Sequence, residues 1–365
     1  MGVRQGRQGR QGRQGRQGRQ VVFVGAGRPL EVWERDVADP GPGAVVLRMV
    51  LGGVCGTDAH RLDGDLPDPG RPVCFGHEGV GTIEALGAGR TTDSSGHPVA
   101  AGDLVYWTPS GRTPAMFPDC GWPPSPDVPN PATYQDFATL GPENCFFKIP
   151  EGTAPEAVIA FGCAMPTACG GMTRLGGIRP RQSVVVQGSG PVGLSATLLA
   201  SLGPARQVIV IGAPDDRLAA ATRLGATTVI PLLTTTIEER RAQVLELTGG
   251  RGADVVIEAA GRMEAFPEGM GLVADGGRYL VMGIYSGHGT VALDAVNLNN
   301  RSLSVIGTMG PASFADYRTT VAIAQRHDAR LGLSELVTHR FPLARTEDAI
   351  AVARAGEAIK AVVTP

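Results

Sequence analysis

Two patterns of hydrophobic and polar positions divide this chain. Between residues 21 and 107 the apolar residues form short runs, such as the alternating segment 30–34 and the β-branched segment 44–50, separated by turns rich in glycine and proline. Runs of this kind are typical of β-strands with one buried face. The first third of the chain therefore predicts a β-rich domain.

After Pro150 the pattern changes to nearly continuous apolar runs that alternate with helical segments. Strands are predicted at 183–187, 207–211, 254–257 and 278–282, and helices at 190–202, 215–224 and 236–247. Strands that are apolar on both faces and separated by helices indicate a parallel sheet buried on both sides. We therefore expect an α/β protein in which a doubly wound domain, 156–297, is inserted into a β-rich domain formed by 21–155 and 298–365.

Residues 1–20 follow neither pattern. From Arg4 to Gln20 the triplet Arg-Gln-Gly repeats without a hydrophobic period, which predicts disorder. Two interpretations stay open: a basic arm that binds RNA or another polyanion, or an extension without a role. Because the whole chain carries −2 and the arm's six arginines carry +6, the remainder carries −8. Such an acidic body makes nucleic acid an improbable partner.

Size and composition fit an ordinary globular enzyme. A chain of 365 residues, 42% hydrophobic and 19% charged, is long enough for two domains. No apolar run reaches the length of a membrane span, and the N-terminus lacks the apolar core of a signal peptide. The six scattered cysteines favour reduced thiols over a disulfide framework. We expect a cytoplasmic protein without a membrane partner.

A glycine-rich turn follows the first predicted strand of the doubly wound domain and opens a predicted helix. It consists of Gly188, Ser189, Gly190, Pro191, Val192 and Gly193. In this context Gly188 would make the turn, Gly190 would let a pyrophosphate approach the backbone, and Gly193 would allow the helix to pack on the strand. Free N–H groups and the helix dipole would face the anion. The turn predicts a dinucleotide site.

The choice between NAD and NADP depends on the end of the second strand of this domain. An acidic residue normally binds the adenosine ribose there, and this chain has Gly212, which removes a carboxylate that would repel a 2′-phosphate. Asp215 and Asp216 would still repel that phosphate, and Arg217 is the positive charge nearby. These charges favour NAD, with NADP left open.

Reactive side chains concentrate in two segments of the β-rich domain. Residues 54–60 read Val-Cys-Gly-Thr-Asp-Ala-His, residues 76–78 read Gly-His-Glu, and Cys163 follows much later. Thiolate and imidazole are zinc ligands, and a catalytic zinc keeps one position open for substrate. Cys55, His77 and Cys163 would supply such a set, although Cys163 is also consistent with a core residue, with Cys169 as a competitor.

Taken together these motifs resemble the zinc-dependent medium-chain alcohol dehydrogenases, whose Cys₂His zinc set is well known. The resemblance spans roughly residues 21–365, and its matching segments are 54–60, 76–81, 102–105, 188–193 and 252–258. It implies a GroES-like catalytic domain joined to a Rossmann domain. It also implies one catalytic zinc and hydride transfer between a primary or secondary alcohol and NAD(P), giving an aldehyde or ketone.

The resemblance assigns roles to the residues around the ligands. Thr57 would take the proton of the alcohol, and His60 would pass it to solvent. Asp58 would orient the ring of His77, and Glu78 would serve as an alternate ligand of the zinc. A homo-oligomer, dimer or tetramer, is implied as well.

One segment departs from the family pattern, and three alternatives remain. Relatives carry a structural zinc on four close cysteines, but the matching lobe, 108–131, has only Cys120, so we expect no structural zinc. The first alternative is a zinc-free quinone or enoyl reductase, which would lack the three candidate ligands. The others are a redox-neutral activity on this scaffold and a polyanion-binding role of the N-terminal arm. Trp107 and Phe161 fit either a substrate pocket or the core.

Overall fold

The computed structural model describes residues 16–108, 129–283, 290–311 and 313–365. Its contacts divide the chain into two compact units, Met1–Cys163 with Tyr317–Pro365, and Ala164–Asp316. Both boundaries lie later than those expected at 156 and 298. Helix α2 (Pro155–Ile159) explains the first difference, because its buried residues pack on strands of the first unit. Strand β14 (Ser304–Gly307) explains the second, because it pairs with the sheet of the second unit.

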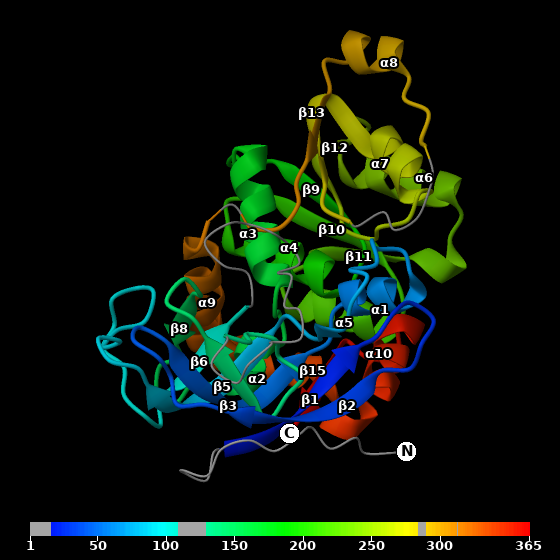
Figure 1. Cartoon of the computed structure of the whole chain (residues 1–365). Coiled ribbons are helices and arrows are strands. Elements are labelled where there is room, and N and C mark those ends of the chain that lie inside the picture. Colours follow the sequence, from blue (N-terminus) through cyan, green and yellow to red (C-terminus); the bar gives the residue numbers. More distant parts are fainter. Residues whose placement is uncertain (1–15, 109–128, 284–289, 312) are drawn as a thin grey trace. The chain divides into compact units, whose positions relative to one another are not determined.

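The first unit is rich in β-strands, as its short apolar runs predicted, and most of its described strand pairs are antiparallel. Within the described residues, six strands of a seven-stranded sheet have the order β15 (Val337–Pro342), β16 (Lys360–Thr364), β3 (Val45–Gly53), β5 (Gly79–Leu86), β6 (Leu104–Trp107) and β8 (Phe146–Lys148) (Figure 1). The seventh strand, β7 (Phe137–Leu140), pairs with β3. The unit also contains α1 (Gly56–Asp63), α10 (Thr346–Ala355) and most of α9 (Ala315–Leu331). Trp107 and Phe161 are fully buried, so both belong to the core.

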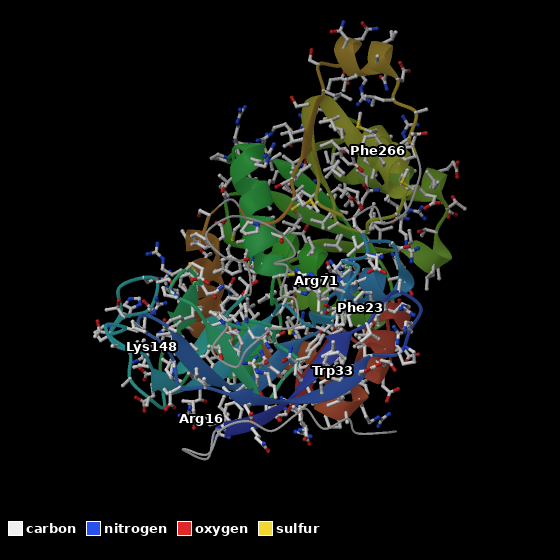
Figure 2. The ribbon with its side chains drawn as sticks, viewed as in Figure 1. Arg16, Phe23, Trp33, Arg71, Lys148 and Phe266 are labelled. Carbon is white, nitrogen blue, oxygen red and sulfur yellow. The ribbon has the colours of Figure 1, made fainter. Side chains whose placement is uncertain are left out.

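The last part of the arginine-rich repeat is folded. Strand β1 (Arg16–Phe23) pairs antiparallel with β2 (Glu31–Val37) and β4 (Val73–Cys74), so the prediction of disorder is wrong for residues 16–20. Arg16, which is labelled in Figure 2, forms an ion pair with Asp39 at 2.7 Å. Arg19 forms one with Asp136 at 2.8 Å. These partners are distant in sequence, which is why local composition did not reveal the strand. Residues 1–15 lie outside the described part of the chain, and a role of the arm stays a prediction.

The second unit has the doubly wound topology that the sequence predicted. Its parallel sheet has the order β11 (Thr228–Pro231), β10 (Gln207–Gly212), β9 (Ser183–Gln187), β12 (Ala253–Glu258), β13 (Val273–Val281) and β14 (Figure 1). Relative to chain order this is 3-2-1-4-5-6, the Rossmann arrangement. The connecting helices are α3 (Ala164–Leu175), α4 (Pro191–Leu202), α5 (Asp215–Arg223), α6 (Ile237–Leu247), α7 (Ala265–Leu272) and α8 (Ala295–Asn300).

A search of the described residues for membrane-crossing helices found none that is long and apolar enough.

Candidate functional site

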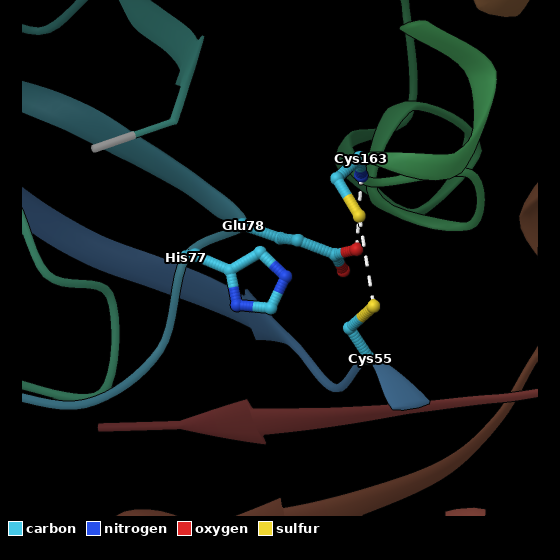
Figure 3. Close-up of side chains that lie close together, drawn as sticks. All are labelled: Cys55, His77, Glu78 and Cys163. Atoms are coloured by element: carbon cyan, nitrogen blue, oxygen red, sulfur yellow. Dashed lines mark hydrogen bonds between the residues drawn. The ribbon is translucent and has the colours of Figure 1, made fainter. Parts of the chain in front are cut away.

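Four side chains of the first unit converge on one point. The potential ligand atoms of Cys55, His77, Glu78 and Cys163 all lie within 4.8 Å of one another (Figure 3). The two sulfurs are 3.6 Å apart. All three predicted zinc ligands belong to this group, whereas the competitor Cys169 lies in α3 and outside it. The arrangement offers two thiols, an imidazole and a carboxylate to a single ion.

Each of these side chains is placed by the end of a regular element. Cys55 is the N-cap of α1, where β3 has just ended. His77 and Glu78 precede β5, and Cys163 occupies the turn between α2 and α3. Gly162, at φ 45°, interrupts the helical path between α2 and α3. The interruption puts Cys163 at the start of a helix instead of inside one.

Asp58 connects two of the candidate ligands. Its Oδ2 accepts the backbone N–H of Cys55 at 3.0 Å, and its Oδ1 lies 3.2 Å from Nδ1 of His77. Because an ionised carboxylate only accepts hydrogen bonds, this contact assigns a ring proton to Nδ1, and in the neutral ring Nε2 then carries the lone pair. The expectation that Asp58 orients the His77 ring agrees with this contact.

Tyr134 supports Asp58 and was missed by sequence reasoning. The fully buried Tyr134 hydroxyl lies 2.7 Å from Asp58 Oδ2, to which it donates, and 3.0 Å from the Gly53 carbonyl. Tyr134 follows the proline-rich lobe, and no motif or periodicity marks its position in the sequence.

Glu78 and Lys360 form a buried ion pair beside the sulfurs. Glu78 Oε1 accepts the backbone N–H of Cys163 at 2.9 Å, and Oε2 contacts the ammonium group of Lys360 on β16. Both side chains are 1% exposed. Lys360 was also missed, although the sequence carries a signal: lysine occurs only here and at Lys148, in a chain that otherwise uses arginine.

The interactions within this cluster shift the pKa values of its two thiols in opposite directions. The pKa of Cys55 lies well below its usual range, first because Cys163 hydrogen-bonds to it and then because of His77 and Lys360. The same hydrogen bond, together with burial, raises the pKa of Cys163. Burial opposes the charge of His77, but Asp58 and Cys55 together outweigh it and raise the pKa of the ring. Cys55 is therefore the first of the two thiols to ionise.

Thr57 and His60 lie three residues apart on α1 and so face the same side of that helix. Thr57 is buried, while His60 is partly exposed and lies with Nδ1 3.0 Å from Asp65 Oδ2. Neither residue belongs to the four-residue cluster. A chain of proton transfer through them stays a prediction.

In the second unit, the turn 188–193 has the geometry expected for a phosphate-binding turn. Gly188 has φ 109°, and a Cβ on Gly193 would lie 2.0 Å from the Gly188 carbonyl oxygen. Gly190 is the N-cap of α4, with Pro191 and Val192 in the first turn. A Cβ on Gly190 would meet nothing within 4 Å. Free N–H groups at the start of α4 are therefore approachable from solvent.

Glycine at position 212 has a steric explanation that the sequence did not show. Ser189 Oγ donates to the Ala213 carbonyl at 2.9 Å and accepts the Ala213 N–H at 3.1 Å. A Cβ on Gly212 would lie 2.4 Å from Ser189 Oγ. The absence of a side chain at 212 thus follows from the contact with Ser189 and is weak evidence about the cofactor. Arg217 is in the first turn of α5, where burial lowers its pKa.

Glu258 organises the carboxyl end of the same sheet. Its oxygens accept the backbone N–H groups of Ala260 at 2.7 Å, Gly261 at 2.6 Å and Gly283 at 3.1 Å. The sequence motif 252–258 includes this residue, but its spacing gave no indication of these bonds.

Cys120 lies outside the described residues, so the expectation of no structural zinc stays a prediction.

Comparisons with known proteins agree with both units. Residues 41–151 match the alcohol dehydrogenase GroES-like domain, and residues 191–326 match the zinc-binding dehydrogenases. The 5-exo-hydroxycamphor dehydrogenase of Pseudomonas putida is 40% identical over 344 residues, covering 92% of this chain and 95% of that protein. An alcohol dehydrogenase of Cupriavidus necator is 29% identical over 343 residues, covering 88% of this chain and 91% of that protein.

Solved structures share the fold over 96% of this chain. An alcohol dehydrogenase from Thermotoga maritima superimposes with a TM-score of 0.83 at 26% identity, covering 96% of this chain and all of that one. A zinc-binding dehydrogenase from Sinorhizobium meliloti, solved with NADP, gives a TM-score of 0.78 at 25% identity over 96% of this chain and all of that one. The chain therefore belongs to the zinc-binding alcohol dehydrogenase family and is an oxidoreductase that acts on alcohols.

Proposed function

We propose that this enzyme interconverts a secondary alcohol and its ketone, using one zinc ion held by Cys55, His77 and Cys163 and a nicotinamide dinucleotide held by the turn 188–193. The observation that carries the proposal is the convergence of the ligand atoms within 4.8 Å. The preference for a bulky secondary alcohol comes from the 40% identical relative, because 5-exo-hydroxycamphor is a bicyclic secondary alcohol.

The donor set fits a catalytic zinc. Two sulfurs and one imidazole nitrogen make a three-ligand site, and the hydrogen bond from His77 to Asp58 leaves Nε2 available for the ion. Zinc, when bound, would supply Lewis acidity toward the alcohol oxygen. The low pKa of Cys55 favours the thiolate that a metal requires.

The protein's own residues then handle the proton and the cofactor. Thr57 would accept the proton released by the alcohol, and His60 would carry it to solvent beside Asp65. Backbone N–H groups at the start of α4 would bind the pyrophosphate. Asp215 and Asp216, in the first turn of α5, would disfavour a 2′-phosphate, so we infer NAD over NADP despite Arg217.

Two further inferences concern assembly and location. Strand β14 is the last strand of its sheet among the described residues. Val305 in this strand, Met309 just after it and Val296 in α8 are exposed. An open strand edge with exposed apolar residues supports a homo-oligomer. A cytoplasmic location is supported by two thiols only 3.6 Å apart, which a reducing compartment keeps from oxidation.

The test is a panel of primary, acyclic secondary and bicyclic secondary alcohols, with the matching carbonyls, assayed in parallel with NAD and NADP. We expect the highest kcat/KM with a bicyclic secondary alcohol and NAD, and about one zinc per chain by metal analysis. Absence of turnover together with absence of zinc would contradict the proposal. A zinc-free reductase is disfavoured because all three candidate ligands are present and close together.

A further inference from the structure

Glu78 is in the ligand cluster, yet both of its oxygens already have partners. We propose that Lys360 is a positioning residue that keeps Glu78 on the backbone of Cys163 and away from the metal, so that the remaining coordination position stays open for the alcohol. The inference rests on the proposed zinc site. In it, Lys360 holds Glu78 away from the metal, whereas the family resemblance implied that Glu78 serves as an alternate ligand.

The first support is the geometry of the carboxylate. One oxygen accepts the Cys163 N–H at 2.9 Å and the other contacts the ammonium group of Lys360 (Figure 3 shows the first of these bonds). Glu78 nevertheless lies within 4.8 Å of both sulfurs and the imidazole. The side chain is thus close enough for a modest movement to bring it to a metal, and two charge-assisted bonds oppose that movement.

The second support is the tight enclosure of the same carboxylate by backbone. A Cβ on Gly53 would lie 2.2 Å from Glu78 Oε2, and a Cβ on Gly162 would lie 2.2 Å from the Glu78 carboxyl carbon. The end of β3 and the turn before Cys163 therefore close on the carboxylate from two sides. Only residues without a side chain permit this position, so the fold is shaped to hold Glu78 where it is.

The third support is electrostatic. Two thiolates already neutralise a divalent ion, and a buried carboxylate beside them would add an uncompensated charge. Lys360, 1% exposed, supplies the opposite charge. The other lysine, Lys148, pairs with Asp103 where both side chains are partly exposed, and so offers a matched control.

The test uses cobalt(II) in place of zinc, because its visible absorption bands report the ligands of the metal. Four variants are compared with the wild type: Glu78→Gln, Lys360→Met, the double variant, and Lys148→Met. We expect Glu78→Gln and Lys148→Met to give the wild-type spectrum. Lys360→Met should shift the bands and lose the spectral change that added alcohol produces. The double variant should recover both, since it has no carboxylate to bind cobalt.

A charge-neutral variant covers the case in which Lys360→Met fails to fold, as burial of a lone Glu78 charge allows. Gly53→Ala displaces the carboxylate while Lys360 remains, and we expect the same band shift as for Lys360→Met. Two results would overturn the inference: a wild-type spectrum altered by Glu78→Gln, which would make Glu78 a ligand already, or unshifted bands in both folded Lys360→Met and Gly53→Ala. Failure of the wild type to bind cobalt or zinc would instead contradict the proposed function.

Discussion

The candidate metal centre and the candidate phosphate-binding turn, 188–193, are built in opposite ways. The turn is six consecutive residues that offer backbone N–H groups, and its shape depends on side chains being absent. The candidate metal centre collects side chains from three places in the chain, 55, 77–78 and 163. Its shape depends on the buried charges of Asp58 and Glu78, which fix the candidate ligands. A contiguous site can therefore be damaged by adding one atom, and a dispersed site by removing one.

The largest effect is expected at the metal centre when a ligand is lost. Cys163→Ser should reduce bound zinc well below one per chain and reduce activity to background, because only two good ligands remain. Metal analysis and steady-state assays check this. Cys169→Ser is the matched control, as Cys169 lies outside the cluster and should keep its zinc. The reverse ranking of these two variants would show that Cys163 is not a ligand.

A comparable effect is expected at the turn when a methyl group is added. Gly193→Ala places a Cβ 2.0 Å from the Gly188 carbonyl oxygen, so it should both lower thermal stability and abolish dinucleotide binding. Gly190→Ala meets no neighbour, so it should weaken binding while leaving stability nearly unchanged. Calorimetric titration with NAD and thermal unfolding separate the two outcomes. Equal loss of stability in both variants would contradict the assigned roles, and zinc content should not change in either.

Removal of the metal should show that the thiols of Cys55 and Cys163 differ in reactivity. After chelation, Cys55 should be alkylated by iodoacetamide faster than Cys163 at neutral pH, because the lowered pKa of Cys55 keeps it ionised there. Its rate should stay high as the pH falls below the usual thiol range, and should drop only below its own lowered pKa. Cys169, whose pKa is raised to about 12, should remain unreacted. Mass spectrometry of the labelled peptides identifies the order, and zinc should protect both ligands.

A smaller effect is expected when the support of a ligand is weakened. Asp58→Asn keeps the shape of the side chain but loses the charge that fixes His77, so metal affinity should fall roughly 10- to 100-fold. Competition with a chromogenic chelator measures the change. An affinity equal to that of the wild type would mean that the carboxylate does not orient the ring.

The smallest effect is expected one step further from the metal. Tyr134→Phe removes a hydroxyl that hydrogen-bonds to a charged group, which should lower the free energy of unfolding by about 1.5–3 kcal/mol. Metal affinity should change less than in Asp58→Asn, because Asp58 keeps its contacts with Cys55 and His77. Chemical denaturation and the same chelator assay check both expectations. A larger loss of metal than in Asp58→Asn would reverse the assigned order of support.

The two sites also differ in how far the sequence predicted them. The turn was predicted with its elements, because a strand, a glycine pattern and a helix follow one another within a short stretch. The candidate ligands were predicted through recognisable motifs around Cys55 and His77. Tyr134 and Lys360 were not, because each acts on a residue far away in the chain, at separations of 76 and 282 residues.

By itself the sequence determined the alternation of strands and helices, the doubly wound fold class and the glycine turn, since these depend on local hydrophobic period and backbone freedom. Tertiary structure decided that residues 16–20 form a strand, that Gly212 is required by Ser189, and that Glu78 faces Lys360. In each of these cases the energy comes from a contact between distant segments. Only the folded chain brings together the partners that give these residues their roles.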